Sequence, residues 1–353
     1  MSDLLSRLKG SGSIKSARLL SESNFFNKKD VVSTDIPALN IALSGSVDGG
    51  LTPGLTFIAG PSRHFKSMFG LLMMKAYLNK YPDAIALFMD SEFGITPQYM
   101  DNVGIDIERV LHIPVEQIEQ LKFDLVNRLN EVKRGDKVFV LIDSIGNLAS
   151  KKEVEDAQDE KSVADMTRAK SIKSLFRIIT PHFTIKDIPC VVINHTYMEQ
   201  TMYPKQIMSG GTGPMYVANQ VFIIGKQKEK DNTDVIGHNF IINVEKSRFV
   251  REYSKIPITV TYEGGIQKYS GIFDLALEAG FIKNPTKGWY AIYDVDTGTT
   301  SNNMRSADIL SGNYLEKIVN HPKFKLFVKQ KYEISQSESS NTISIEDDED
   351  LDE

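Results

Sequence analysis

The chain has 353 residues, of which 41% are hydrophobic and 25% charged, so it has room for one large α/β core with small extensions or for two modest domains. No apolar run approaches the roughly 18 residues that span a bilayer, and residues 1–10 lack the apolar stretch of a secretory signal, which leads us to expect a soluble, cytoplasmic protein. The net charge of −5 does not exclude a nucleic-acid partner, because eight acidic residues and no basic ones follow residue 334, and the rest of the chain carries 41 basic and 38 acidic residues, a net +3.

Residues 1–30 are predicted to form an amphipathic arm. Apolar residues recur there at near-helical spacing, with basic residues between them. The apolar set is Leu4, Leu5, Leu8, Leu19, Leu20, Phe25 and Phe26. An arm outside a core has to bury this face, and we predict that it does so on a neighbouring subunit, which makes it an oligomerisation arm. Packing on its own core is the alternative.

Residues 31–270 alternate between short apolar strands and helical segments. The predicted strands are 55–59, 84–89, 137–142, 190–193, 221–224 and 240–244, and helices are predicted between them, for example at 67–79, 115–132 and 163–179. The runs 84–89, 138–142 and 189–193 are nearly continuously apolar, which is typical of strands covered on both faces of a mostly parallel sheet. The last run holds Cys190, the one cysteine of the chain, which we expect to be a reduced, buried thiol. The alternation predicts an α/β fold.

Two further segments complete the predicted organisation. Residues 271–334 mix helix and loop signals and are predicted to form a small C-terminal subdomain. Residues 335–353 are acidic and rich in serine, so they cannot bury enough apolar surface to fold and are predicted to be a disordered tail. That tail is either a solubilising end or a polyanion that competes with DNA for a basic surface.

A candidate phosphate-binding loop follows the strand 55–59. It consists of Gly60, Pro61, Ser62, Arg63, His64, Phe65, Lys66 and Ser67, and a predicted helix follows it. In a P-loop, backbone N–H groups surround the phosphates at a helix N-terminus, the lysine reaches the β- and γ-phosphate oxygens, and the hydroxyl ligates Mg²⁺. Phe65 stands where the motif has a second glycine, so we expect its φ to be negative and its ring to point away. Alone, the segment fits an ordinary strand–loop–helix turn equally well.

Three residues at or beyond strand ends strengthen the case for a nucleotide site. Strand 137–142 ends in Asp143, where a P-loop protein delivers a carboxylate to Mg²⁺. Strand 84–89 leads into Asp90-Ser91-Glu92, and a carboxylate one strand from the loop can orient and deprotonate an attacking water. Seven residues on, Tyr99 offers an aromatic face for adenine. Taken singly, Asp90 or Asp143 fits a capping aspartate, Glu92 a solvated glutamate and Tyr99 a core tyrosine.

Together these segments resemble RecA-type recombinases, and in longer stretches the UvsX recombinases of T4-like phages. The resemblance covers roughly residues 1–290 and rests on 60–67, 25–32, 90–97, 147–153, 210–216 and the pair Asn194-His195. The phenylalanine at position 65 is itself a UvsX feature.

The resemblance implies a role for each matched residue. Lys66 and Ser67 bind phosphate and Mg²⁺, Asp143 is the Walker B acid, Glu92 is the catalytic carboxylate, and Tyr99 stacks on adenine. His195 senses the γ-phosphate and passes the signal to the following loop, and a polar residue that merely closes a strand is the alternative.

Two DNA-binding loops are also implied, at about 150–161 and 197–211. In the second loop the predicted DNA contacts are Tyr197, Met198, Met202, Tyr203, Lys205 and Met208. Aromatic and thioether side chains beside glycines suit stacking on bases, and such a loop is expected to be mobile. An ordinary loop packed on the core is the alternative.

The resemblance further implies that Lys246 and Arg248 reach the ATP of the adjacent subunit. A solvated basic turn is the alternative.

The sequence thus predicts a RecA-type ATPase that uses ATP and Mg²⁺, forms a helical filament on single-stranded DNA and pairs that strand with a homologous duplex. Hydrolysis then loosens the filament. Loading and single-strand-binding proteins are expected partners, and the expected compartment is the host cytoplasm if a phage encodes the chain. Two other classes share parts of the pattern: a RecA-fold helicase that forms closed rings, and a binding module that uses ATP only to assemble. Glu92 argues against the binding module.

Overall fold

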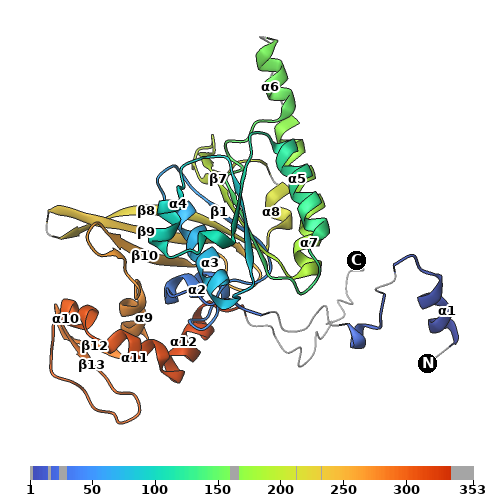
Figure 1. Ribbon diagram of the computed structural model, residues 1–353. Coiled ribbons are helices and arrows are strands. Elements are labelled where there is room, and N and C mark those ends of the chain that lie inside the picture. Colours follow the sequence, from blue (N-terminus) through green and yellow to red (C-terminus); the bar gives the residue numbers. More distant parts are fainter. Residues whose placement is uncertain are drawn as a thin grey trace, which may run out of the picture.

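The computed structural model describes residues 3–14, 17–23, 30–159, 167–211, 213–231 and 233–334. Across these residues the centre is a nine-stranded sheet with the order β11–β10–β9–β8–β1–β5–β4–β2–β3 (Figure 1). Its strands are β1 (Gly54–Ala59), β2 (Ile85–Asp90), β3 (Val110–Pro114), β4 (Val138–Asp143), β5 (Pro189–Asn194), β8 (Gln220–Asp231), β9 (Asp234–Ser247), β10 (Lys255–Thr261) and β11 (Gly265–Ile266).

The neighbouring strands from β8 to β3 run parallel, whereas β9, β10 and β11 extend the sheet in antiparallel fashion. The predicted α/β fold with a mostly parallel sheet is therefore confirmed. The parallel register brings the carboxyl ends of the strands to one edge, where Asp90 pairs with Asp143 and Ala59 pairs with Asn194. Ligands of open α/β sheets bind beyond this edge.

Helices cover both faces of the sheet. On one face α3 (Lys66–Lys80) buries Phe69 and Leu71, and on the other α5 (Ile118–Glu131) and α7 (Thr167–Lys186) bury Leu125 and Phe176. Central strands contribute alternate side chains to these two cores, which explains their nearly continuous apolar sequences. Among the helices in the described ranges, none is long and apolar enough to cross a membrane.

Cys190 lies in the core on the α5–α7 face and is fully buried, as predicted. Burial raises the pKa of its thiol well above the ordinary value, because the thiolate would lose its hydration. The thiol therefore stays protonated and unreactive in the folded protein.

The C-terminal elements form a small lobe that lies beneath β8, β9 and β10 in Figure 1. They are α9 (Ile272–Glu278), β12 (Ile282–Thr286), β13 (Trp289–Ile292), α10 (Ser306–Ser311), α11 (Tyr314–Asn320) and α12 (Pro322–Tyr332). Leu315, Phe324 and Val328 are buried in the same core as α3 and α2 (Pro37–Ser44). The lobe is thus anchored on the face of the sheet that also supports the candidate phosphate loop.

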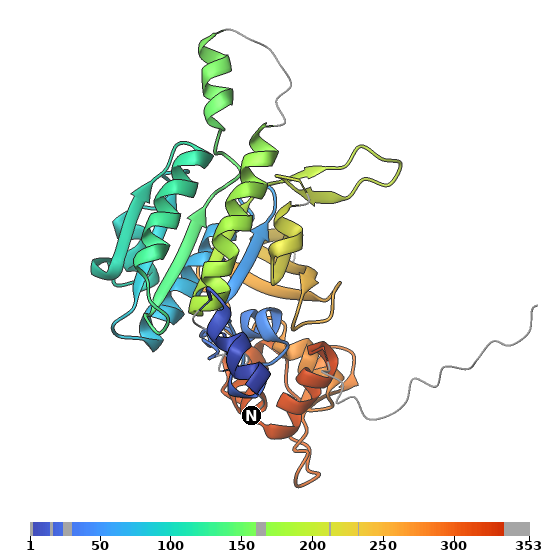
Figure 2. The same cartoon turned by 90° about the vertical axis from the view of Figure 1, so that its right-hand side faces the viewer.

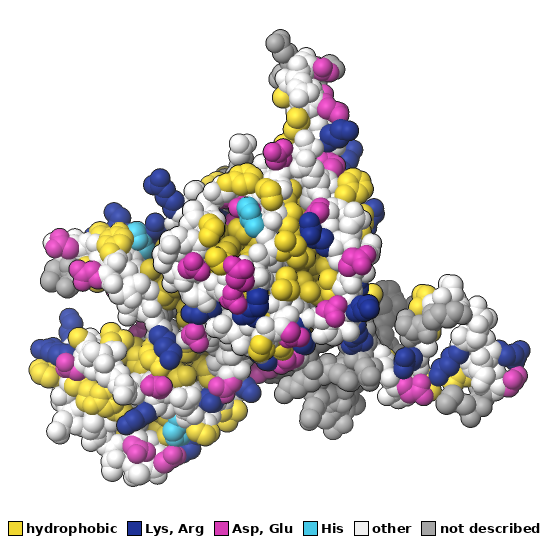
Figure 3. All heavy atoms as spheres, viewed as in Figure 1, with side chains coloured by type: hydrophobic (Ala, Val, Ile, Leu, Met, Phe, Trp, Pro, Cys, Tyr) yellow, Lys and Arg dark blue, Asp and Glu magenta, His cyan; other side chains and the backbone are white. Residues whose placement is uncertain are grey.

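The N-terminal arm contains α1 (Asp3–Ser11) and a 3₁₀ turn (Leu20–Glu22), and neither buries a side chain. Leu4, Leu8 and Leu20 are between 55% and 76% exposed. Figures 1 and 3 show this segment standing away from the body, with basic and apolar side chains on it. Within the described residues its own core does not cover the arm, which leaves assembly with a second subunit as the prediction. Phe25 and Phe26 lie outside the described residues.

Two elements project from the same end of the molecule (Figure 2). The expected loop at about 150–161 is instead largely a helix, α6 (Lys151–Gln158), whose N-cap Ser150 and Glu153 form a capping box. The expected loop at 197–211 begins as a hairpin of β6 (Thr196–Met198) and β7 (Gln206–Met208). Local capping and cross-strand pairing thus order much of both predicted DNA-binding segments, and their role in DNA binding stays a prediction.

Candidate functional site

Residues 60–65 connect β1 to α3, and Lys66 begins this 15-residue helix. A Cβ on Gly60 would lie 3.1 Å from the carbonyl oxygen of Ile224, so glycine lets the loop pack closely on β8. Lys66 is buried, and its Nζ donates to the carbonyl of Pro61 at 2.9 Å. The lysine thus lies folded across a loop that ends at a helix N-terminus, the arrangement that binds phosphate.

The backbone of this loop differs from the sequence-based expectation. Phe65 has a φ of +62°, in the left-handed region, so the prediction of a negative φ was wrong. Its ring stacks on Phe240 of β9, with centroids 4.9 Å apart and planes 16° apart, and meets Phe69 edge-on at 5.5 Å. A non-glycine residue held in a sparsely populated region costs about 1–3 kcal/mol, and each aromatic pair contributes about 0.5–1.5 kcal/mol. The two ring contacts therefore offset most or all of the backbone cost.

Glu92 lies in a turn that Asp90 holds. Oδ1 of Asp90 accepts hydrogen bonds from the backbone N–H groups of Glu92 and Phe93, at 3.0 and 2.8 Å. Asp90 therefore closes the turn that follows β2. Oε1 of Glu92 in turn accepts from Oγ of Ser144 at 2.8 Å and from Nδ2 of Asn147 at 3.3 Å.

His195 completes this cluster, because its Nε2 lies 3.2 Å from the same Glu92 oxygen. The approach depends on Gly146, since a Cβ there would lie 2.1 Å from the His195 ring. The hydrogen bond from His195 lowers the pKa of Glu92 most, and Ser144 and the charge of Lys66 lower it further, against the effect of burial. Glu92 is thus held ionised in a hydrogen-bonded setting.

Asp143 has the environment of a cation ligand. It is 2% exposed, and its Oδ1 has no hydrogen-bond partner in the described part of the protein. Burial raises its pKa to about 6, although a hydrogen bond from the side chain of Ser67 opposes the rise. A buried carboxylate oxygen without a partner, next to a hydroxyl, fits Mg²⁺, which binds one or two protein oxygens and takes its other ligands from water and phosphate. The described residues contain no cluster of three or more His, Cys, Asp or Glu side chains that could hold a metal alone.

Three predicted site residues lie outside this cluster. Tyr99 is on α4 (Pro97–Val103) and 41% exposed. Lys246 is level with Phe57 of β1, because both pair with Val221 of β8. Gly60 is therefore roughly 10 Å further along the strand direction and two strand spacings across. Lys246 and its neighbour Arg248 thus do not complete the phosphate loop of their own chain. Nζ of Lys246 instead donates to the carbonyls of Met215 and Tyr216 in α8 (Gly213–Val217).

The β6–β7 hairpin is tied directly to the cluster. Ser209 N–H donates to the carbonyl of His195, and the Ser209 hydroxyl donates to Oδ1 of the buried Asn194. Five of the six residues predicted to contact DNA are exposed on the hairpin. They are Tyr197, Met198, Met202, Tyr203 and Lys205. Met208 is only 3% exposed because it packs into the core on the α5–α7 face. The structure thus corrects the prediction that Met208 faces DNA.

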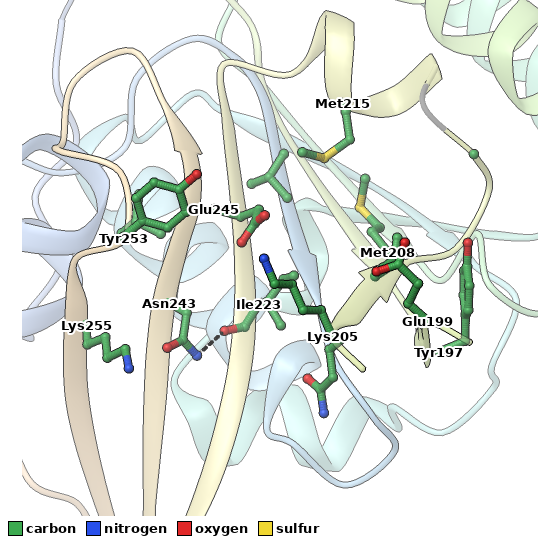
Figure 4. Close-up of a pocket in the computed structure, with 15 residues that line it drawn as sticks. Tyr197, Glu199, Lys205, Met208, Met215, Ile223, Asn243, Glu245, Tyr253 and Lys255 are labelled. Atoms are coloured by element: carbon green, nitrogen blue, oxygen red, sulfur yellow. Dashed lines mark hydrogen bonds between the residues drawn. The ribbon is translucent and has the colours of Figure 1, made fainter. Parts of the chain in front are cut away.

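A pocket of about 690 Å³ lies between the hairpin and the strands β8 and β9 (Figure 4). Met208 and Met215 line it together with Ile223, and charged side chains such as Lys205 and Glu245 lie around them. Met215 belongs to α8, whose carbonyls hold Lys246. The surface beside Lys246 is therefore concave and open to another molecule.

Sequence reasoning missed several residues of the cluster. Ser144 and Asn147 hold Glu92, Gly146 makes room for His195, and Asn194 connects that histidine to the hairpin. A polar stretch directly after the strand that ends in Asp143 was a usable signal for Ser144 and Asn147. Lys226 was also missed. Its Nζ donates to the carbonyl of Arg63 in the phosphate loop at 3.4 Å, and no local pattern indicates this contact.

Two family models match the chain. The RecA N-terminal domain family matches residues 4–267, and the family described as the C-terminal domain of the bacteriophage T4 recombination and repair protein matches residues 269–328. The chain therefore belongs to the RecA family: it is a RecA-type recombinase, a DNA-dependent ATPase.

Within this family the chain is 52% identical to the recombination and repair protein of Enterobacteria phage T4, over 99% of this chain and 90% of the phage protein. The expectation that the resemblance covers only residues 1–290 was therefore wrong, because the similarity continues through the C-terminal lobe. The RecA proteins of Streptomyces venezuelae and Leifsonia xyli subsp. xyli are 26% and 24% identical to this chain, over 78% and 84% of its length and 71% and 81% of their own lengths. The predicted class of recombination and repair protein is thus confirmed, and the ring-forming helicase is not favoured.

Proposed function

We propose that the loop at 60–67 binds the phosphates of ATP and that Glu92 activates the water that attacks the γ-phosphate. The observation that carries this proposal is the position of Glu92: it is held by three hydrogen-bonding side chains and feels the charge of Lys66 of the loop. An ionised carboxylate in that position orients the water and accepts its proton. Lys66 contacts the β- and γ-phosphate oxygens.

Ser67 and Asp143 would hold the Mg²⁺ ion of the nucleotide. When bound, this ion neutralises charge on the phosphate oxygens. The unpartnered Oδ1 of Asp143 and its adjacent hydroxyl support this assignment. Tyr99, exposed on α4, provides the face on which adenine stacks.

His195 links the nucleotide to DNA in this proposal. It hydrogen-bonds Glu92 with its ring and accepts from Ser209 at the base of the hairpin with its carbonyl. A γ-phosphate that competes for the ring would therefore shift the residue on which the hairpin is anchored. The exposed aromatic and thioether side chains of that hairpin stack on the bases of single-stranded DNA.

The protein works as a helical filament on single-stranded DNA and pairs that strand with a homologous duplex. Lys246 and Arg248 cannot serve their own phosphate loop, and they complete the ATP site of the adjacent subunit. The exposed arm joins neighbouring subunits through its apolar side chains. Loading and single-strand-binding proteins are its further partners, and it acts in the cytoplasm of the phage's host.

A strand-exchange assay between a circular single strand and a homologous linear duplex tests the proposal. We expect joint molecules and nicked circles that depend on ATP and Mg²⁺. Negative-stain images with single-stranded DNA and a non-hydrolysable ATP analogue should show open helical filaments. Closed rings, together with duplex unwinding and no exchange, would overturn the proposed assembly and reaction.

A further inference from the structure

The phosphate loop contains two non-glycine residues in the left-handed region. Arg63 has a φ of +60° and Phe65 a φ of +62°. L-residues adopt this conformation reluctantly because Cβ approaches the following carbonyl oxygen. Phe65 stands, moreover, at the position where the phosphate-loop motif has glycine. The loop therefore needs contacts from elsewhere to keep this shape.

A single cross-strand pair contacts both of these residues, in addition to the edge-on contact of Phe65 with Phe69. Lys226 of β8 and Phe240 of β9 are direct partners in the antiparallel register. Phe240 is 5% exposed and stacks on the ring of Phe65 at 4.9 Å. Nζ of Lys226 donates to the carbonyl of Arg63 at 3.4 Å and lies 5.8 Å from the centroid of the Phe240 ring. Each strained residue of the loop thus has one partner in the pair.

We propose that Lys226 and Phe240 are positioning residues that hold the phosphate loop in its nucleotide-binding shape, in place of the conformational freedom of a glycine. The proposal rests on the proposed role of this loop in binding phosphate. A phosphate loop works by aiming backbone N–H groups at the ligand, so its affinity depends on φ and ψ at each residue. Here these angles depend on the antiparallel extension of the sheet.

The stack of Phe240 on Phe65 also distinguishes the proposed positioning role from ordinary core packing. If Phe240 acted only as a buried apolar residue, its removal would have the same effect whatever residue stood at position 65. If Phe240 acts through the Phe65 ring, its effect on nucleotide affinity should vanish once a glycine at position 65 makes the stack unnecessary.

A double-mutant cycle measures this difference. The variants are Phe240→Leu, Phe65→Gly and the combination, each in the full chain, and the measured quantity is the Kd of a fluorescent ATP analogue. We expect Phe240→Leu to weaken binding about fivefold to tenfold, the range of one aromatic pair. Phe65→Gly sets the reference Kd of the glycine background, and Phe240→Leu should weaken binding by less than about twofold in that background. Equal loss in both backgrounds, or no loss at all, would overturn the proposal.

Two further variants distinguish loss of the ring contact from a folding defect caused by replacing the buried Phe240. Phe65→Leu leaves the buried Phe240 in place and keeps a side chain at the strained φ without the ring. It should bind about fivefold more weakly than Phe65→Gly, and equal affinity of the two would also overturn the proposal. Phe273→Leu is the matched control, because it removes an aromatic contact with Tyr290 (5.0 Å) in the C-terminal lobe. It should leave nucleotide affinity unchanged.

Lys66→Ala distinguishes a failure of the proposed function from a failure of the proposed positioning role. If Lys66→Ala leaves nucleotide affinity within about threefold of the parent, the loop does not bind phosphate, and the proposed function fails along with the positioning role of Lys226 and Phe240. If Lys66→Ala abolishes binding while the cycle shows no coupling, the phosphate loop stands and the role of Lys226 and Phe240 is refuted. Strong loss with Lys66→Ala together with coupling in the cycle supports both.

Discussion

At the scale of single residues, Glu92 shows how neighbours prepare a carboxylate for chemistry. Asp90 fixes the backbone that carries it, and Ser144, Asn147 and His195 converge on one of its oxygens. The hydrogen bonds from His195 and Ser144 lower the pKa of Glu92, so the group is ionised at neutral pH and available to accept a proton. The second carboxylate oxygen remains for the attacking water.

We expect Glu92→Gln to retain ATP and lose hydrolysis. The amide oxygen still accepts from Ser144, so nucleotide affinity should stay within about threefold of the parent. An amide cannot take a proton, and turnover should fall by about 10²–10⁴-fold, while complexes with single-stranded DNA become longer-lived. Steady-state ATPase and DNA dissociation rates check this. Glu108→Gln is the control. Glu108 is an exposed acid in the 3₁₀ turn Ile107–Arg109, outside the cluster around Glu92, and this variant should hydrolyse ATP normally. Normal turnover of Glu92→Gln would place the general base elsewhere.

The candidate site could be predicted where a residue's role depends on local spacing. Lys66, Asp143 and Glu92 follow apolar strands within a few positions, and the parallel sheet brings such ends together. The conformation of Phe65 depends on Phe240, 175 positions later, and the burial of Met208 depends on α7 and the sheet. Contacts of that kind leave no trace in a short sequence window, which is why those two predictions were wrong.

At the scale of elements, the strands show the same difference between features set by local sequence and features set by contacts with distant residues. The buried cores of β1, β2, β4 and β5 were predicted from their apolar runs. β9 spans Asp234–Ser247, but only residues 240–244 were predicted as strand, because residues 234–239 include just two apolar side chains and are mostly exposed or half-buried. β3 was missed because it is a short edge strand that exposes Leu111 and His112. Edge and ribbon strands depend on pairing more than on burial.

The hairpin offers a test at this scale, because its exposed and buried residues should behave differently. Tyr203→Ala removes an exposed ring and should lower affinity for single-stranded DNA about tenfold, with the free energy of unfolding unchanged within about 0.5 kcal/mol. Met208→Ala should lower the free energy of unfolding by about 2–5 kcal/mol and leave DNA affinity of the folded protein nearly intact. Urea unfolding and fluorescence anisotropy measure the two quantities. The reverse pattern would show that Met208 turns outward to meet DNA.

At the scale of the whole molecule, charge distribution matters more than net charge. Residues 335–353 lie outside the described residues, but their eight acids convert a chain of +3 into one of −5. If this segment competes with DNA, deleting it should tighten duplex binding on the order of tenfold at low salt, and the difference should shrink as salt is added. A variant with the same length and its acids changed to amides should match the deletion. Unchanged duplex binding across the salt series would leave the tail a solubilising role.

Assembly is the second property of the whole molecule, and Lys246 and Arg248 report on it. They lie too far from their own phosphate loop to complete it, beside an open pocket on the sheet. Preorganised cations stabilise the charge that develops during phosphoryl transfer, so a neighbour that supplies them raises the rate. We expect the double variant Lys246→Ala/Arg248→Ala to bind nucleotide as an isolated subunit and to lose DNA-stimulated hydrolysis.

Mixing two inactive variants tests this sharing directly. A Lys66→Ala subunit cannot use its own ATP but still presents Lys246 and Arg248 to its neighbour. A subunit with both cations changed to alanine keeps an intact phosphate loop but has no cation to offer. In mixed filaments, each intact loop that faces a Lys66→Ala neighbour should regain hydrolysis. The control is a second mixture, in which Lys228→Ala/Lys230→Ala takes the place of Lys246→Ala/Arg248→Ala. It removes two positive charges from the adjacent strand β8 and so shows the effect of nonspecific charge loss. If the two inactive variants co-assemble on DNA and their mixture hydrolyses no more ATP than either alone, the ATP site is not shared between subunits.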